Sequence, residues 1–318
     1  MGVQQNFFDF ARASFGKTRT EKLLEKINKV VPWKEMEADI LIRRDKTYGG
    51  VGRPNMDIIK LLKCLFLQGM YQLSDPEVED QLRDRMSFQK FVGISKEEDI
   101  PDDTTICKFR NELVKIGFQE SIFTKTQYIL SEIGFTVKEG HIQDGTIIDS
   151  AKGKKNKYGE NTRDKEATFV KKNGQSYHGY KAHIETSEKG DFIMNTTYTT
   201  ASVHDSQQQD ALMNGDETCG YGDSAYGMSK EKNLFYEELG MQVEFHEKGV
   251  RGAPLTPYQK EQNRIKSTIR AKVEHPFAWI KGRYMYTKTK YRGMLKNSMH
   301  WFLLSAIYNF DLLARRYA

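Results

Sequence analysis

Apolar residues recur at helical spacing through the first 135 residues of the chain. One group follows the three-to-four-residue repeat of an amphipathic helix: Leu23, Leu24, Ile27, Val30 and Val31. The stretch NMDIIKLLKCLFLQGMYQL, which ends at Leu73, predicts a second and strongly apolar helix after Pro54. The pattern therefore predicts an all-helical N-terminal domain over residues 1–135.

Polar residues mark the starts of two further helices in this domain. A Ser-x-x-Glu capping box at 74–77 opens the segment DPEVEDQLRDRM, and Asp102 or Asp103 can cap the segment TTICKFRNELVKIG. Two short helices, a connector and a third helix carrying Lys108 and Arg110 could form a helix-turn-helix that contacts DNA. The alternative is that these helices only pack against one another, and the sequence leaves both interpretations open.

After Gly134 the pattern changes to that of β-strands. Three β-branched segments predict consecutive strands: HIQDGTIIDSA, HGYKAHIETS and DFIMNTTYTTA. Turn residues at 188–190 predict a hairpin between the second and third. Helices and strands then alternate through HDSQQQDALMNG, CGYGDSAYG, MSKEKNLFYEELG and MQVEFHEK. This order predicts an α/β domain over 136–318, with a mixed five-stranded sheet and flanking helices.

The segment RAKVEHPFAWIKGR, residues 270–283, combines a polar and an apolar face. At about 100° per residue, a helix would place Arg270, Glu274 and Lys281 on one narrow polar face. The apolar residues occupy an adjoining sector: Ile269, Val273, Phe277 and Ile280. A helix that lies on a core with a polar edge aimed into a cleft has this pattern, and so does an ordinary amphipathic helix with an Arg–Glu pair. Pro276 predicts a kink.

Composition indicates a soluble globular protein. The chain has 318 residues, of which 29% are charged and 38% hydrophobic, which favours two domains and excludes a disordered chain. No apolar run approaches the roughly 20 residues that span a bilayer, and the N-terminus lacks the pattern of a secretory signal. The three cysteines are far apart in sequence, which argues against a disulfide framework or a cysteine-rich zinc site and favours a reducing cytosol.

Positive charge is concentrated in two segments although the net charge is only +6. Residues 151–181 hold nine Lys and Arg against three acids, and residues 264–296 hold ten against Glu274 alone. Such segments favour a polyanion, because phosphate contacts supply most sequence-independent affinity for nucleic acid. For the first segment a solvated loop is the alternative. The cations assigned to DNA here are Lys154, Lys155, Lys157, Lys181, Arg264, Lys266, Arg283, Lys288, Lys290 and Arg292.

Three acids stand where a metal site could form. Asp144 lies within the first predicted strand, Asp223 ends the fourth, and Glu274 lies on the helix expected to pack beside them. Three carboxylates within a basic framework suit two hard divalent cations, so magnesium is the expected metal. Each acid also has a structural alternative: Asp144 could be a turn residue, Asp223 could bond turn amides, and Asp149 competes for the first position.

Several stretches resemble successive blocks of a known enzyme family. These are DGTIIDSAKGKKNK, TRDKEATFVKKNGQSYHGYKAHI, TTASVHD, GDSAYG and RAKVEHPFAWIKGRYMYTKTKYRGMLKN. They are similar, over about 139–316, to the insertion-sequence-five family of bacterial DDE transposases, within the insertion-sequence-four-like superfamily. The resemblance implies an RNase H-like core whose metal ligands are Asp144, Asp223 and Glu274. It favours Asp144 over Asp149, because the family's Asp-x-Thr block aligns through 155–157 only with Asp144 as its acid.

Arg270 and Lys281 match the Arg-x3-Glu-x6-Lys signature of the wider superfamily. That signature begins with a tyrosine three residues before the arginine, where this chain has Ser267, and no tryptophan lies between Asp223 and Glu274. These two differences argue against a phosphate-gripping tyrosine and disfavour a DNA-hairpin intermediate, while the route of strand cutting stays open.

The resemblance also implies a mechanism and partners. Two Mg²⁺ ions, for which Mn²⁺ could substitute, would help water to cut transposon ends and the freed 3′-hydroxyl to attack target DNA, while Arg270 and Lys281 position phosphates. The partners would be double-stranded terminal inverted repeats and target DNA, bound by a homodimer in the nucleoid of a bacterial cytoplasm, without a membrane. A non-catalytic DNA-binding derivative and a metal-dependent nuclease that does not join strands are the alternatives.

Overall fold

The structure is a computed structural model, and it describes residues 16–45, 56–134, 140–172, 174–187, 192–213, 218–225 and 230–317. The predicted domain boundary at 135/136 and the predicted hairpin turn at 188–190 lie outside the described residues. Within these ranges, none of the helices combines the length and the apolar character needed to cross a bilayer.

The N-terminal part is helical, as predicted. Its helices are α2 (Arg19–Val30), α3 (Trp33–Asp45), α4 (Ile58–Tyr71), α5 (Asp75–Asp84), α6 (Met86–Val92), η1 (Glu97–Asp99), α7 (Asp103–Lys115) and α8 (Phe118–Glu132). The predicted capping box opens α5: the Ser74 backbone N–H donates to the Glu77 carboxylate at 2.6 Å, and the Glu77 N–H to the Ser74 hydroxyl at 3.4 Å. Asp102 caps α7 by accepting from the Thr105 N–H at 2.6 Å.

The five predicted strands form one mixed sheet together with a sixth, short strand. The strands are β1 (Gly140–Asp149), β2 (Thr168–Lys172), β3 (Gln175–Ser187), β4 (Ile193–Thr200), β5 (Cys219–Gly222) and β6 (Gln242–Phe245). β3 runs antiparallel to β1 and β4, whereas β5 runs parallel to β1 and β6. β2, which the sequence pattern did not predict, pairs antiparallel with the first residues of β3.

The remaining elements are helical. They are η2 (Asp205–Gln207), α9 (Gln209–Leu212), α10 (Lys230–Glu238), α11 (Pro257–Arg270), η4 (Ala271–Val273), α12 (Glu274–Ala278), η5 (Trp279–Arg283) and α13 (Met294–Tyr317). The segment 270–283 is helical as predicted, but it changes from a 3₁₀ turn (η4) to an α-helix (α12) and then to a π-helix (η5). Pro276, within α12, has no N–H to donate, which accounts for an irregular helix at this point.

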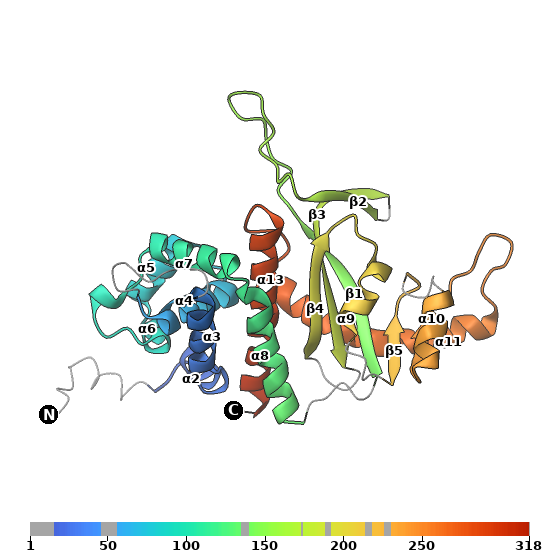
Figure 1. Cartoon of the computed structure of the whole chain (residues 1–318), viewed down its shortest axis with the longest axis horizontal. Helices are drawn as coiled ribbons and strands as arrows, with labels where there is room; N and C mark the ends of the chain where they lie inside the picture. Colours follow the sequence, from blue (N-terminus) through green and yellow to red (C-terminus); the bar gives the residue numbers. More distant parts are fainter. Residues whose placement is uncertain are drawn as a thin grey trace.

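A continuous hydrophobic core joins the helical part to the sheet. The N-terminal helices lie on one side of α13 and the sheet on the other (Figure 1). Trp301 of α13 is fully buried, and its indole N–H donates to the Thr196 hydroxyl of β4 at 2.6 Å. Its ring stacks near Phe277 of α12 at a centroid distance of 6.4 Å. The core therefore fixes the position of α12, the helix that begins with Glu274, over the sheet.

Candidate active site

Asp144 and Asp223 lie side by side on neighbouring strands. In the parallel pairing of β1 with β5, Ile142 is opposite Tyr221. Continuing this register by two residues places Asp223, which directly follows β5, beside Asp144 on the same face of the sheet. Electrostatics agrees with this placement, because the charge of Asp223 raises the pKa of Asp144. The sheet thus brings together two acids that are distant in sequence.

Glu274 approaches the same place from the covering helix. It is the first residue of α12 and is exposed, whereas Val273 and Phe277 beside it are buried at 0% and 5% exposure. Ile280 is also fully buried, which confirms the apolar sector predicted for this segment. The charge of Glu274, like that of Asp223, raises the pKa of Asp144. The charges of two of the predicted acids, Asp223 and Glu274, therefore both act on the third, Asp144.

Asp144 is a largely buried carboxyl group with charged neighbours of both signs. Its side chain is 16% exposed, and its pKa is raised from 3.8 to about 6, chiefly by burial and further by Glu274 and Asp223. The Arg270 guanidinium, 3.8 Å from the Asp144 carboxylate, and the Gly145 N–H, which donates to it at 2.8 Å, act in the opposite direction. A largely buried carboxylate with two further carboxylates near it supplies the oxygen ligands that a hard divalent cation prefers.

The acids do not form a finished metal cage. Among the residues that the structure describes, no group of three or more His, Cys, Asp or Glu side chains is arranged to hold a metal ion. The donor chemistry fits a cation, but the oxygens of Asp144, Asp223 and Glu274 would have to converge further around it.

Arg270 and Lys281, the two predicted phosphate contacts, both reach β1. Arg270 lies beside Asp144, as described above. The Lys281 ammonium donates to the Thr146 hydroxyl and, at 3.3 Å, to the Ile147 carbonyl. Burial lowers the pKa of Lys281, and the nearby positive charge of Lys172 acts in the same direction. The helical segment thus brings both cations to the strand that carries Asp144.

Asp149, the rival first acid, lies five residues further along β1. At about 3.3 Å per residue this is roughly 16 Å from Asp144, and the odd spacing turns its side chain to the opposite face of the strand. The regular register from His141 to Asp149 leaves no bulge that would reverse this alternation. The geometry favours Asp144 as the partner of Asp223.

His246 is a residue of this site that the sequence pattern did not single out. In the parallel pairing of β5 with β6, Gly222 is opposite Phe245, and the His246 N–H donates to the Gly222 carbonyl at 3.3 Å. His246 therefore lies beside Asp223 and completes a row with Asp144 across three strands. The one signal in the sequence was its position within the predicted strand segment MQVEFHEK, the next predicted strand after the one that ends at Asp223.

The cations assigned to DNA fall into an exposed and an inward-facing group. Lys108, Lys154, Lys155, Lys157, Arg264, Arg283, Lys288 and Arg292 are exposed. Of these, Arg264 pairs with Glu261 at 2.7 Å, and the Arg283 guanidinium lies 5.1 Å from the centroid of the Trp279 ring.

Arg110 faces the interior of the helical part. It is 8% exposed, pairs with Asp75 and donates to Gln68 at 3.4 Å. Its guanidinium also lies 4.8 Å from the centre of the Tyr291 ring. Lys108 is thus the predicted DNA contact that α7 presents to solvent.

Lys181, Lys266 and Lys290 are also held by protein groups. Lys181 pairs with Asp205 at 2.9 Å and Lys266 with Glu244 at 3.0 Å, and their side chains are only 12% and 14% exposed. Lys290 donates to a backbone carbonyl at 3.4 Å, and burial lowers its pKa to about 8. These three side chains are therefore not part of the exposed basic surface.

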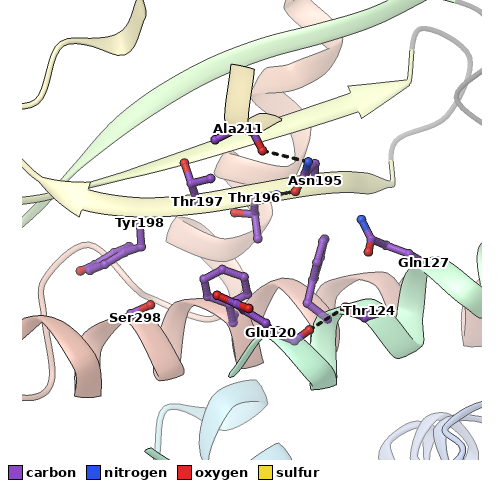
Figure 2. A pocket seen from close by; sticks show the side chains of 11 residues that line it. Glu120, Thr124, Gln127, Asn195, Thr196, Thr197, Tyr198, Ala211 and Ser298 are labelled. Carbon is purple, nitrogen blue, oxygen red and sulfur yellow. Dashed lines mark hydrogen bonds between the residues drawn. The ribbon is translucent and has the colours of Figure 1, made fainter. Parts of the chain in front are cut away.

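A polar cavity of about 430 Å³ lies away from the acids, between α8, β4 and α13 (Figure 2). Glu120 and Gln127 of α8, Asn195 of β4 and Ser298 of α13 line it. None of the site residues predicted from the sequence contributes to this lining.

A mixed sheet with acids on adjacent central strands, and a third acid on a helix covering them, is the arrangement of an RNase H-like nucleic-acid enzyme. Two family models match the chain: Transposase domain (DUF772) at residues 14–112, and Transposase DDE domain at residues 138–310. The second covers more than half of the chain, and the protein therefore belongs to the insertion-sequence transposases with a DDE domain. These enzymes act on DNA and generally use divalent metal ions. No solved structure matches the chain.

Proposed function

We propose that this transposase cleaves the ends of its DNA element and joins their 3′-hydroxyls to target DNA, with Asp144, Asp223 and Glu274 as ligands for two divalent cations. The observation that carries this proposal is the register of β1 and β5, which sets Asp144 beside Asp223, together with the charge of Glu274 acting on Asp144 within the DDE domain. Mg²⁺ is the expected ion and Mn²⁺ a substitute, because both prefer oxygen ligands. When bound, the ions would supply Lewis-acid stabilisation of the attacking and leaving oxygens.

The protein's own groups would bind and orient the DNA backbone at this site. Lys281 is anchored on Thr146 and Ile147 of β1, and Arg270 lies beside Asp144. Their charges flank the acids, so the two side chains would hold scissile and adjacent phosphates and stabilise negative charge as it develops there.

A projecting arm extends the basic surface. The arm, residues 150–167, lies between β1 and β2 and projects beyond the end of the sheet (Figure 1). Lys155 and Asn161 form an antiparallel bridge, and the Asn156 side-chain oxygen accepts from the Tyr158 and Glu160 N–H groups, both at 2.9 Å. These bonds give the tip of the arm a defined turn.

Two acids anchor the base of the arm to the start of α13. The Asp164 carboxylate accepts from the Tyr180 hydroxyl at 2.8 Å and the Gly293 N–H at 2.9 Å. The Glu166 carboxylate accepts from the Met294 N–H at 2.7 Å. The acids of the arm base are therefore used in the fold, while the lysines further out face solvent. We infer that the arm contacts the phosphate backbone of duplex DNA.

We expect the double change Lys155→Gln and Lys157→Gln to weaken duplex binding and reduce its salt dependence. If each lysine contacts one phosphate, the slope of log K against log[salt] should fall by about 2. Fluorescence anisotropy over a salt series measures this slope. The matched control is Lys248→Gln with Lys260→Gln, which removes the same charge from exposed positions outside the arm. Equal slopes for wild type and the arm variant would contradict the arm contact.

The N-terminal helices would recognise terminal inverted repeats or mediate dimerisation. The match of residues 14–112 to the Transposase domain supports a role in transposition, and Lys108 is exposed on α7 for a DNA contact. Dimerisation on the DNA ends would bring two active sites to one target.

An assay with pre-cleaved ends and a supercoiled target separates this function from its alternatives. We expect Mg²⁺-dependent joined products, because strand transfer requires the 3′-hydroxyl of the element to attack the target. A nuclease would cut intact ends without forming joined products. A non-catalytic derivative would bind ends and do neither, and either outcome would contradict the proposal.

A further inference from the structure

The hydrogen bonds around His246 fix which of its ring nitrogens carries the proton. The Ser267 hydroxyl donates its one proton to the Asn263 carbonyl at 2.8 Å. The contact of 3.3 Å between Ser267 Oγ and His246 Nε2 therefore requires Nε2 to be the donor. Nδ1 is then the acceptor, and its partner is Arg270, whose Nη1 donates at 3.5 Å. Burial and the charge of Arg270 lower the pKa of His246, in agreement with a neutral ring.

The His246 ring is held in place because α11 is attached to the chain around it. The Asn263 side chain donates to the Glu247 carbonyl at 2.9 Å and accepts from the Glu247 N–H at 3.0 Å. The Lys266 ammonium donates to the Phe245 carbonyl at 3.1 Å. Residues before and after His246 are thus bonded to the helix that carries Ser267 and Arg270.

Arg270 lies between His246 and Asp144 without closing a tight pair with the acid. Its Nη2 is 3.8 Å from the Asp144 carboxylate, which is beyond hydrogen-bond distance. Its Nε is buried and has no hydrogen-bond partner in the described part of the chain. In a bidentate pair, the guanidinium and the carboxylate would compensate each other's charge and occupy each other's hydrogen-bonding groups. The observed geometry leaves the acid available to a cation and the guanidinium available to an anion.

We propose that His246 is a positioning residue of the DNA site: by accepting from Arg270 at Nδ1, it holds the guanidinium for a DNA phosphate and away from a closed pair with Asp144. This inference rests on the proposed function, since it assigns the Arg270 guanidinium to DNA. His246 acts through Arg270 and contacts neither DNA nor a cation itself. The role of Ser267 is to keep the proton of the ring on Nε2.

The first test compares the affinities of His246→Phe and His246→Asn for end DNA in EDTA, so that no cation or bond cleavage contributes. Phenylalanine fills the space of the ring but offers no acceptor, and we expect affinity to fall about tenfold, within the range of coupled neighbours. Asparagine places an acceptor oxygen near the Nδ1 position, and we expect affinity within about threefold of wild type. The control is His204→Phe, the same change at an exposed histidine outside the row.

The second test is a double-mutant cycle with Arg270→Gln. If His246 works by holding Arg270, the variant carrying both His246→Phe and Arg270→Gln should bind end DNA no more weakly than Arg270→Gln alone. Additive losses, or wild-type affinity of His246→Phe, would overturn the inference.

These outcomes remain separable from loss of folding and from failure of the proposed function. Thermal unfolding of each variant reports folding, and if His246→Phe does not fold, an asparagine variant as weak as Arg270→Gln overturns the inference instead. Absence of strand joining by the wild type would contradict the proposed function while leaving the EDTA affinities unchanged. Additive losses in the double-mutant cycle would contradict the role of His246, while strand joining by the wild type would still support the proposed function.

Discussion

Asp223→Asn is expected to abolish metal-dependent cleavage of transposon ends while end binding stays near wild type. Asparagine keeps the shape of aspartate and can still accept from the Ala225 N–H, which donates to Asp223 at 2.8 Å. The turn after β5 should therefore persist. The charge beside Asp144 is lost, and a cation loses a ligand. Removing one charge-stabilising group from an active site costs about 10²–10³ in rate, and loss of a metal ligand should cost at least as much.

Cleavage of labelled end DNA in Mg²⁺, with binding measured in EDTA, tests this expectation. Asp149→Asn is the matched control. It is also an Asp-to-Asn change, but Asp149 lies on β1 with its side chain turned to the face opposite that of Asp144. It should cleave far better than Asp223→Asn. A fully active Asp223→Asn variant would refute the assignment of Asp223, and loss of cleavage on changing Asp149 instead would restore the rival acid.

Local sequence patterns predicted most of the fold because they act over a few residues. The capping box at Ser74 and Glu77 formed as expected, and the five predicted strands all pair. β2 was missed because its residues, TFVKK, are largely exposed and have no buried face to produce an alternating pattern. It forms a strand through its neighbour, since the first residues of β3 extend past β4 and offer an open edge.

The candidate site could be anticipated from the sequence where its chemistry follows from residue type. It could be anticipated less well where it depends on the direction in which a side chain points. A run of positive charge showed a basic segment, but it did not show that Lys181 turns to Asp205, 24 residues away. Arg110 likewise pairs with Asp75, from another helix. His246 was missed because only the register of β5 and β6 shows that it lies beside Asp223. Such contacts come from tertiary packing, which residue spacing does not encode.

Asp144→Asn is expected to stabilise the metal-free protein at neutral and alkaline pH. In the folded protein the pKa of Asp144 is about 6, against an ordinary value of 3.8, so the folded state binds this proton more tightly than the unfolded chain does. Ionisation of Asp144 therefore lowers the free energy of unfolding as pH rises from about 4 to about 6, and the loss is nearly complete above the folded-state pKa. By linkage the cost reaches about 3 kcal/mol at most, at about pH 8. Asparagine, which does not ionise, removes this cost.

Urea unfolding in EDTA at about pH 8 and pH 5 measures the effect. The gain in unfolding free energy of Asp144→Asn over wild type should be largest at pH 8 and fall to about half at pH 5, because the wild-type carboxyl is then largely protonated. Mg²⁺ or Mn²⁺ at about ten times its dissociation constant should add about 1.4 kcal/mol to the wild type and much less to the variant. If wild type and variant gained equally from the cation, Asp144 would not be a metal ligand. If the variant were less stable than wild type at pH 8, the ionised carboxylate of Asp144 would not destabilise the wild-type fold. Together the two measurements separate the electrostatic cost of the site from its use, because a site built to bind a cation should be least stable when its acids are ionised and the cation is absent.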